Sequence, residues 1–489
     1  MKIAFASSEA YPYAKTGGLG DVVGALPKAL AELGCDVKVF IPKYSSIDHY
    51  RYDLSYCWPI GEMPIRVYGK VYNVNVFTSN LPDSEVTIYL IDSPEFFSRP
   101  EIYTNDPDED ERFILFSKSI LEALQRLKWQ PDVINCNDWQ TGLIPLYIKD
   151  NYSWDKFFDP IATVFTIHNI GYQGRFPKET LNKAEIRPEL FYENSPVEIW
   201  NSVSFLKTGL MYADMINTVS KTYAKEILTP QYGAGLEGVL HYRNDDFYGI
   251  VNGVDYKIWN PEDDRHIPFH YIRDTRHRKI ENKKFLMDAV RLPFHTEKPL
   301  IGIVSRLVAQ KGFDLIVDAF NELLKIDAQW IILGSGEDQF EEFFRRGAYY
   351  YPEKIYTYIG YNNELSHLVE AGSDIFLMPS HYEPCGLSQI YSLRYGTVPV
   401  VRNTGGLADT VSDWHELLYE GKETGTGFTF DEYTPDALYS TLYRAVKTFD
   451  DKVTWQKIMY NGMSEDFSWE VSAKKYLELY RKAVHKRRG

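Results

Sequence analysis

The sequence is poor in cysteine and contains no long apolar run. Its 489 residues include only 4 cysteines, none in a CxxC pair or at a spacing typical of metal ligands: Cys35, Cys57, Cys136 and Cys385. So few cysteines favour a reducing compartment, where structural disulfides are rare. No stretch of about 18 apolar residues occurs, so we expect no membrane span. The first expected strand starts at Lys2, which leaves no room here for a signal or transit peptide. We expect a cytoplasmic protein, although a processed organellar enzyme would look the same.

Positive charge is also scarce. The chain has 53 Lys and Arg against 68 Asp and Glu, a formal net charge of -15 at pH 7. Nucleic-acid binding needs a basic surface, so we expect no nucleic-acid partner, whereas a local basic pocket for a phosphate remains compatible with this balance. Aromatic residues are abundant, with 37 Tyr and 10 Trp. Composition alone favours core and interface packing over sugar stacking as their role.

Short β-branched runs alternate with helical patterns along the whole chain, which predicts an α/β fold with parallel sheets. A chain of this length holds about two or three domains. We place a boundary at Gly253, which gives domains at 1–253 and 254–463, and expect a last helix over 464–489 with a basic end that favours its dipole. The expected strands are 2–7, 37–40, 86–91, 133–136, 161–167, 215–219, 247–251, 300–304, 330–333, 355–358, 375–378 and 398–401.

A lysine and several glycines follow the first expected strand, in Lys15-Thr16-Gly17-Gly18-Leu19-Gly20. We expect a helix to open at Asp21 as an acidic N-cap and to stop at Gly34. The glycines would let the backbone approach a ligand, although a tight turn needs them too. Neither GxGxxG nor GxxxxGK is present, so dinucleotide and P-loop sites are disfavoured. Lys15 beside a helix N-terminus, with its dipole and free N–H groups, makes an anion site.

A second basic group follows the strand at 300–304. Arg306 offers a rigid fork to a phosphate, and Lys311 offers a point charge. Taken alone, the two residues fit a solvated basic loop as well as they fit a phosphate site. Helix N-terminal groups expected at Gly386-Leu387 and the turn Thr404-Gly405-Gly406 favour a phosphate site.

Polar residues end two strands of the expected first sheet. His168 follows the strand 161–167, and Asp138 follows the strand 133–136. Ligands of doubly wound folds bind outside the carboxyl ends of the strands. A histidine at a strand end is also often a satisfied core group, and Asp138 is at least as well suited to cap a helix that starts at Gln140. Both interpretations remain open at this point.

We expect Glu383 and Cys385 to belong to the same site as Arg306 and Lys311. Glu383 precedes Pro384, which favours an extended backbone there. Its carboxylate suits a helix N-terminus, and it equally suits a developing oxocarbenium ion. The Cys385 thiol at a helix N-terminus is a candidate nucleophile. Because no histidine partner is evident, we reject acyl transfer.

The acidic run Asp106-Pro107-Asp108-Glu109-Asp110 contains overlapping DxD patterns. Such a pair can hold a divalent ion on a diphosphate. The run precedes the helical pattern of Phe113, Ile114 and Phe116, so we interpret it as an acidic loop and a helix start. We therefore predict no metal site.

Taken in order, seven motifs closely resemble those of the bacterial glycogen synthase and plant starch synthase family of retaining glycosyltransferases. The resemblance covers essentially the whole chain, and the shared order makes it specific. The motifs are KTGGLGDV (Lys15–Val22), NDWQTGL (Asn137–Leu143), HNIGYQG (His168–Gly174), VNGVD (Val251–Asp255), SRLVAQKG (Ser305–Gly312), EPCGLSQ (Glu383–Gln389) and TGGLADTV (Thr404–Val411).

The resemblance implies an α/β protein of the GT-B fold, in which two Rossmann-like doubly wound domains face a central cleft and the C-terminal helix crosses back to the N-terminal domain. It implies transfer of glucose from ADP-glucose to the non-reducing 4-OH of an α-1,4-glucan, with retention of configuration and without a metal or cofactor. The expected partners are ADP-glucose and a glucan acceptor (glycogen, starch or a maltooligosaccharide), with no nucleic acid and no membrane.

The resemblance also assigns roles, position by position. The expected catalytic residues are His168, Arg306, Lys311 and Glu383, of which Arg306 and Lys311 bind the diphosphate. Tyr361 stacks on adenine, and Asp21 lies by the nucleotide sugar. The other residues expected to bind substrate are Lys15, Gly17 and Gly18 at the diphosphate, Thr404, Gly405 and Gly406 at the distal phosphate, and Asp138, Asn169, Asn252, Cys385, Gly386 and Leu387 around the glucose.

One position separates this chain from the wider GT-B group. Members of that group often have a second glutamate eight positions after the one that corresponds to Glu383, and this chain has Tyr391 there. Starch and glycogen synthases also lack this second glutamate. Its absence therefore disfavours the interpretation of this chain as a sucrose- or mannose-transferring enzyme. Two alternatives remain: a GT-B transferase that uses UDP-glucose, and a non-catalytic glucan-binding paralogue, against which the intact set of expected site residues argues.

Overall fold

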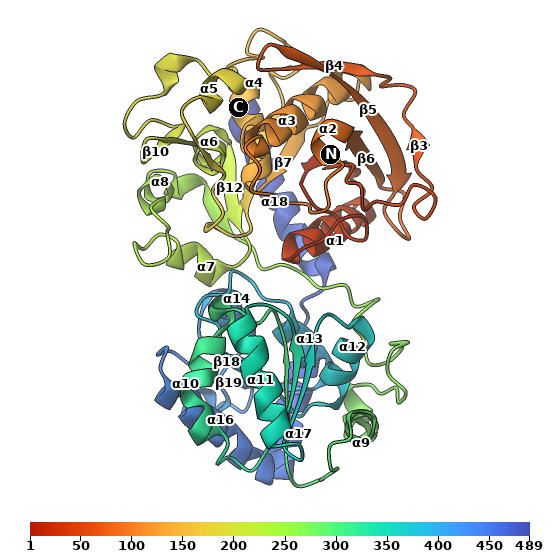
Figure 1. Cartoon of the computed structure of the whole chain (residues 1–489), viewed down its shortest axis with the longest axis vertical. Helices are drawn as coiled ribbons and strands as arrows, with labels where there is room; N and C mark the ends of the chain where they lie inside the picture. Colours follow the sequence, from red (N-terminus) through yellow and green to blue (C-terminus); the bar gives the residue numbers. More distant parts are fainter. The chain divides into compact units, whose positions relative to one another are not determined.

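The computed structural model describes residues 1–489 and contains two compact units (Figure 1). Unit 1 comprises Met1–Gly253 together with Trp469–Gly489, and unit 2 comprises Val254–Ser468. Each unit is an α/β layer structure around its own sheet. No helix of the chain has both the length and the apolar character needed to cross a membrane.

Unit 1 is built on a 10-stranded sheet of order β13-β12-β8-β7-β1-β2-β6-β5-β3, with β4 paired to β5. All pairs from β13 to β6 are parallel, whereas β3, β4 and β6 each pair antiparallel with β5. The central strands are buried along their length, as expected for a parallel sheet covered on both faces. The strands are β1 (Lys2–Ala6), β2 (Asp36–Pro42), β3 (Ser55–Tyr56), β4 (Met63–Val67), β5 (Lys70–Asn80), β6 (Thr87–Asp92), β7 (Val133–Asn137), β8 (Ala162–Ile167), β12 (Met215–Thr218) and β13 (Phe247–Gly249).

The helices of unit 1 include one from the end of the chain. The C-terminal α18 packs against α1 and β8. The helices are α1 (Gly18–Glu32), α2 (Pro94–Phe97), α3 (Glu109–Arg126), α4 (Ile144–Lys149), α5 (Thr180–Lys183), α6 (Phe205–Tyr212), α7 (Lys221–Glu226), α8 (Glu237–Tyr242) and α18 (Trp469–Arg488). A small antiparallel sheet is formed by β9 (Arg175–Phe176), β10 (Glu198–Ile199) and β11 (Ser202–Ser204).

The basic end of α18 has specific partners beyond the favourable dipole that the sequence predicts. The Lys486 ammonium lies 2.5 Å from the Asp246 carboxylate, and the Arg488 guanidinium lies 2.8 Å from that of Asp132. These exposed pairs contribute at most about 1 kcal/mol each. Together they attach the end of the helix to unit 1.

Unit 2 is built on a 6-stranded sheet of order β16-β15-β14-β17-β18-β19, in which every pair is parallel. Its strands are β14 (Leu300–Val304), β15 (Gln329–Gly334), β16 (Ile355–Ile359), β17 (Ile375–Met378), β18 (Val398–Arg402) and β19 (Phe428–Phe430). Its helices are α9 (Lys279–Val290), α10 (Phe313–Leu323), α11 (Asp338–Tyr350), α12 (Asn363–Gly372), α13 (Ser388–Tyr395), α14 (Gly405–Thr410), α15 (Trp414–Tyr419), α16 (Pro435–Asp450) and α17 (Lys452–Ser464).

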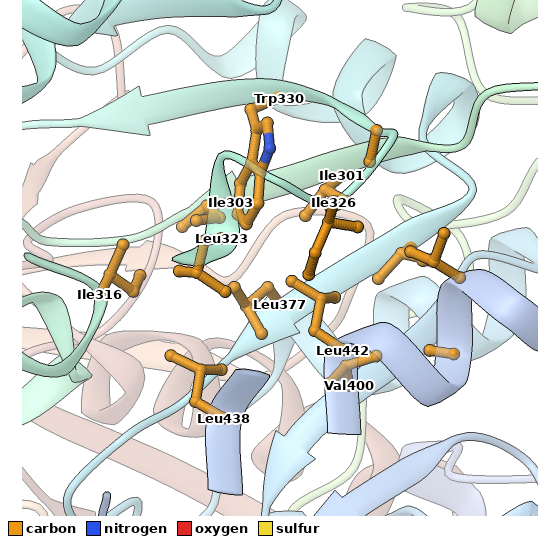
Figure 2. Close-up of a cluster of buried hydrophobic side chains, with 14 of the residues drawn as sticks. Ile301, Ile303, Ile316, Leu323, Ile326, Trp330, Leu377, Val400, Leu438 and Leu442 are labelled. Atoms are coloured by element: carbon orange, nitrogen blue, oxygen red, sulfur yellow. The ribbon is translucent and has the colours of Figure 1, made fainter. Parts of the chain in front are cut away.

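Side chains that alternate along the unit 2 strands enter two separate cores. Ile301 and Ile303 of β14 lie in one cluster, shown in Figure 2, with Trp330 of β15. Leu300 and Ile331 lie in the cluster on the opposite face. Because successive side chains of a strand point to opposite faces, apolar residues at every position require helices on both faces. This explains why the strands read as continuous apolar runs.

Each strand that the sequence predicts is present, with ends within two residues of the expected ones. The sequence reading missed β5, the longest strand of the sheet. In β5 the buried Tyr72, Val74 and Val76 alternate with more exposed residues, as in a strand with one face in solvent. That period of two was the signal that could have revealed it.

The start of α1 differs from the prediction. The helix begins at Gly18, with Gly17 as the N-cap in extended conformation (φ -158°, ψ -160°), so the prediction of Asp21 as N-cap was wrong. Within the helix, a Cβ on Gly24 would lie 2.7 Å from the Tyr11 carbonyl oxygen, so this glycine lets α1 pack closely against the loop before it. Gly34, with φ +84°, follows the helix end as predicted.

The acidic run at 106–110 is a loop and a helix start, as the sequence predicts, because α3 begins at Glu109. Its carboxylates are paired within unit 1. The Arg99 guanidinium lies 2.7 Å from Asp106 and 2.5 Å from Asp108, and the Lys183 ammonium lies 3.1 Å from Asp110. No group of three or more His, Cys, Asp or Glu side chains is arranged to hold a metal ion.

Candidate active site

Polar residues gather at the carboxyl ends of the adjacent strands β1, β7 and β8 of unit 1. His168 follows β8, and its ring Nε2 lies 2.9 Å from the Asn137 Oδ1 at the end of β7. Its backbone N–H donates to the Asp138 Oδ1 at 2.7 Å. Burial lowers the pKa of His168 to about 3, so the imidazole is neutral at physiological pH.

Hydrogen bonds to the Asp138 side chain connect the loop after β7 to the loop after β8. Its carboxylate accepts hydrogen bonds from the backbone N–H groups of His168 and Asn169. Burial raises its pKa to about 7 against the effect of these bonds. The short helical turn that follows starts at Trp139, and the Asp138 side chain makes no capping bond to it, so the capping interpretation was wrong. Asp138 also holds φ +55°, a strained conformation of the kind found at functional sites.

The depressed pKa of His168 predicts an acid-dependent loss of stability. As the pH falls, the unfolded state, with a histidine pKa near 6.5, takes up a proton before the folded state does. The contribution of the neutral His168 to the free energy of unfolding is therefore complete above pH 6.5 and is lost as the pH falls toward 3. Between pH 7.5 and pH 5, wild type should lose about 2 kcal/mol more than His168→Gln in urea unfolding. Asp138, with its raised pKa, changes the free energy of unfolding in the opposite direction over this pH range. Because wild type and variant share Asp138, the difference between them isolates the effect of His168.

The exposed His295 provides the control for this measurement. His295→Gln should follow wild type at both pH values. Equal losses for His168→Gln and wild type would show that the buried imidazole does not govern this part of the pH profile.

Glu9, which the sequence reading missed, organises the Lys15 loop. Its buried carboxylate accepts from the Thr16 amide at 2.7 Å, from the Thr16 hydroxyl at 2.6 Å and from the Tyr103 hydroxyl at 2.6 Å. The Gly17 amide, expected to bind a diphosphate, donates to the same carboxylate at 3.3 Å. The only sequence feature that could have indicated this role is the position of Glu9, an acidic residue shortly after the end of β1.

The remaining candidates of unit 1 have different surroundings. The Lys15 ammonium lies 2.7 Å from the Asp21 carboxylate, so these two residues form an ion pair next to the start of α1. The Asn169 Oδ1 accepts from the Gly171 amide at 3.0 Å. Asn252 is buried, and its Oδ1 has no hydrogen-bond partner. An unpaired buried acceptor is costly, which marks this oxygen as one available to a ligand.

In unit 2, two candidates meet directly. The Lys311 ammonium lies 2.5 Å from the Glu383 Oε2, which also accepts from the Ser380 hydroxyl at 3.1 Å. Glu383 is 5% exposed. Arg306, which follows β14, is exposed and its guanidinium makes no hydrogen bond or ion pair within the chain. The structure therefore presents one free cation and one carboxylate-paired cation in the segment after β14.

Glycines bring the loop of Glu383 into backbone contact with the start of α14. The Gly406 amide donates to the Glu383 carbonyl at 3.1 Å. A Cβ on Gly405 would lie 1.9 Å from that carbonyl oxygen, and one on Gly406 would lie 2.0 Å from the Cys385 oxygen. Leu387 and Thr404 are the N-caps of α13 and α14. Two helix N-termini thus begin from one tightly packed pair of loops, with Cys385 buried in it and Gly386 in the left-handed region at φ +70°.

Gly406→Ala should destabilise unit 2, because no Cβ can occupy the space beside the Cys385 carbonyl without moving the loop. We expect a loss of about 3 kcal/mol or more in chemical denaturation. Gly347→Ala is the matched control, since a Cβ in that helical position meets its nearest atom at an ordinary 3.5 Å. It should change stability by no more than about 1 kcal/mol. Equal effects of the two variants would contradict the close packing.

Two tyrosines of unit 2 have contrasting environments. Tyr361, which follows β16, is 82% exposed, and its hydroxyl donates to the Asn363 Oδ1 at 3.1 Å. Tyr391 stacks on Trp259, with ring centroids 4.0 Å apart, and Trp259 stacks in turn on His367 at 3.7 Å. The position where wider GT-B enzymes often have glutamate is thus filled by a three-ring stack.

The fold and these strand-end residues define a glycosyltransferase of the GT-B fold. The catalytic domain of starch synthase IV from Arabidopsis thaliana, bound to ADP and acarbose, superposes with a TM-score of 0.90 at 32% identity, covering 99% of each chain. Sucrose-phosphate synthase from Thermosynechococcus elongatus shares the fold, with a TM-score of 0.60 at 18% identity over 99% of each chain.

The family follows from the sequence comparisons. A family described as "Starch synthase catalytic domain" matches residues 2–242, and one described as "Glycosyl transferases group 1" matches residues 288–455. Glycogen synthase of Desulforudis audaxviator is 46% identical, covering 99% of this chain and 97% of the relative, and that of Moorella thermoacetica is 44% identical over 100% and 98%. The chain belongs to the glycogen synthase and starch synthase family, which confirms the resemblance seen in its motifs.

Proposed function

We propose that the chain transfers glucose from ADP-glucose to the non-reducing 4-OH of an α-1,4-glucan, with retention of configuration. The observation that carries the proposal is the contact between the Lys311 ammonium and the Glu383 carboxylate at 2.5 Å, with the unpaired Arg306 in the same segment after β14. It combines cations for a departing diphosphate with a carboxylate for a sugar that becomes cationic. The relatives named glycogen synthase and the ADP-bound starch synthase support this donor and acceptor.

The proposed roles follow from the charges that develop as the C1–O bond breaks. The leaving ADP gains negative charge, which Arg306 and Lys311 stabilise, with the turn Thr404-Gly405-Gly406 at the distal phosphate. The glucose becomes cationic, and we assign its stabilisation to the Glu383 carboxylate in unit 2 and to the backbone carbonyl of His168 in unit 1. The acceptor hydroxyl attacks from the face that ADP leaves and passes its proton to the phosphate.

Other residues bind and orient the donor in this proposal. In unit 1, the neutral His168, Asp138, Asn169 and the unpaired Asn252 Oδ1 suit the glucose hydroxyls. In unit 2, the backbone from Cys385 to Leu387 is assigned to the same sugar. Tyr361 offers an exposed ring for adenine to stack on. Lys15 and the amides of Gly17 and Gly18 assist at the diphosphate, where a phosphate competes with Asp21 for Lys15 and with Glu9 for the Gly17 amide. The low cysteine content and the bacterial relatives support a cytoplasmic location.

Nucleotide release tests this proposal. ADP-glucose and UDP-glucose are supplied separately, with maltotriose as acceptor and EDTA present. We expect acceptor-dependent release of ADP with lengthening of the glucan. Release from UDP-glucose alone would overturn the donor, and activity only without EDTA would overturn the metal-free mechanism. A folded protein that releases neither nucleotide would favour the non-catalytic paralogue.

A further inference from the structure

The side chain of Gln389, in the first turn of α13, is fully buried and has no part in the reaction proposed above. Its Nε2 donates to the Cys385 carbonyl at 3.0 Å and to the Gly386 carbonyl at 3.1 Å. A carbonyl oxygen only accepts hydrogen bonds, so the NH₂ end of the carboxamide must face these two groups. One side chain therefore fixes two successive peptide groups of the loop that follows Glu383.

Gly386 permits this close contact between the backbone and the carboxamide. Its φ of +70° lies in the left-handed region, which glycine adopts at little cost. A Cβ on this residue would lie 2.6 Å from the Gln389 Oε1, so any other residue at this position would displace the carboxamide. The conformation of the loop and the position of the glutamine side chain therefore depend on each other.

The two fixed carbonyls determine where the next two backbone N–H groups point. In a planar trans peptide, the C=O and the N–H point in opposite directions. The N–H groups of Gly386 and Leu387 are therefore directed away from the Gln389 carboxamide. Neither of them donates to another group of the chain, and both residues are partly exposed. Because an N–H only donates, a ligand of this pair must offer acceptor oxygens.

A third hydrogen bond connects the same carboxamide to α14. The Gln389 Nε2 donates to the Thr410 hydroxyl at 3.2 Å, and that hydroxyl donates to the Gly406 carbonyl at 2.7 Å. Helix α14 begins at Gly405, within the turn that we assign to the distal phosphate. Gln389 is thus bonded to both of the adjacent loops of unit 2 that the proposed function assigns to the donor.

We propose that Gln389 is a positioning residue, whose carboxamide fixes the direction in which the Gly386 and Leu387 N–H groups are presented to hydroxyl oxygens of the transferred glucose. The identity of the sugar rests on the proposed function. Gln389 acts through the backbone and contacts no substrate itself. Donors that are oriented before the ligand arrives need no reorganisation during the reaction, so their direction affects both donor binding and the rate.

Gln389→Met tests the proposal, because methionine has a similar length and no N–H. The two carbonyls lose their donor and turn toward other partners, which redirects the neighbouring N–H groups. Affinities for ADP-glucose and for ADP are measured by calorimetry, and kcat is measured with maltotriose. We expect the affinity for ADP-glucose and kcat each to fall about tenfold or more, and the affinity for ADP, which has no sugar, to change by less than about twofold.

Gln329→Met is the matched control. Gln329 is also buried in unit 2, and its Nε2 also donates to two carbonyls, those of Pro293 at 2.9 Å and Glu353 at 3.0 Å. Its Oε1 has no partner, as in Gln389. It is the first residue of β15, at the opposite end of the strands from the candidate site. We expect both variants to shift the urea midpoint similarly, and Gln329→Met to keep the wild-type affinity and kcat.

A folded Gln389→Met that binds ADP-glucose as tightly as Gln329→Met would overturn the inference, and equal losses for ADP and ADP-glucose would contradict the orientation toward the sugar. If the methionine variant is not folded, Gln389→Asn, whose amide is one methylene too short to reach both carbonyls, should show the same selective loss. The titrations are repeated with UDP-glucose and UDP. A wild type that binds only UDP-glucose would overturn the proposed donor, and a selective loss of UDP-glucose affinity in the variant would keep this inference. A wild type that binds neither sugar nucleotide would overturn both.

Discussion

Lys311→Ala and Arg306→Ala should each lower kcat/KM about 10²–10³-fold, the usual effect of removing one preorganised group that stabilises transition-state charge. The two cations follow β14 and have different environments, since Lys311 is paired with Glu383 and Arg306 is unpaired. Both are expected to act on the departing diphosphate. Steady-state rates with ADP-glucose and maltotriose measure the effect.

Lys325→Ala provides the control for the loss of a positive charge, because Lys325 is exposed and paired with Glu322 on the surface of unit 2. Its kinetics should match wild type. If Lys311→Ala or Arg306→Ala is folded and retains near-full turnover, that residue has no role in the transition state.

Glu383→Ala is the second change with a large expected effect. The Glu383 Oε2 accepts hydrogen bonds from both Lys311 and Ser380 in a buried position. Its removal leaves the Lys311 ammonium without its partner and takes away the negative charge that we propose to stabilise the developing sugar cation. We expect kcat to fall about 10²–10³-fold.

Glu383→Gln separates charge from shape in this argument. Glutamine keeps an oxygen for Ser380 and Lys311 but carries no charge, so a loss close to that of alanine would show that the charge is what matters. A glutamine variant with wild-type kcat would contradict the electrostatic role. Glu342→Ala, which removes an exposed carboxylate of α11, should leave kcat unchanged.

The parallel core strands were predictable because burial on both faces forces continuous apolar runs, as in β14 and β17. Two strands at the edge of unit 1 were missed. β5 is only half buried and carries an alternating pattern in place of a continuous apolar run, and β3 spans just Ser55 and Tyr56. The start of α1 was misplaced because Gly18 and Gly20 suggested a loop, whereas Gly20 is a helical residue packed against Lys15.

The identities of the candidate site residues were predictable from motifs, but their partners were not. Asp138 and His168 come from strands that are neighbours in the sheet, and Lys311 and Glu383 are 72 residues apart in sequence. Such contacts depend on strand order, which local patterns do not encode. The role of Glu9 was missed for a different reason. Its carboxylate binds Thr16, which is close in sequence, but the irregular loop between them has no periodic pattern that would indicate the contact.

The central claim is tested most directly by the product made from maltotriose and carbon-labelled ADP-glucose. The account predicts maltotetraose in which the label is at the non-reducing end and is joined by an α-1,4 linkage, as seen by NMR. A β linkage would contradict retention of configuration, a label at another position would contradict the acceptor assignment, and free labelled glucose without a longer glucan would contradict glucan synthesis itself.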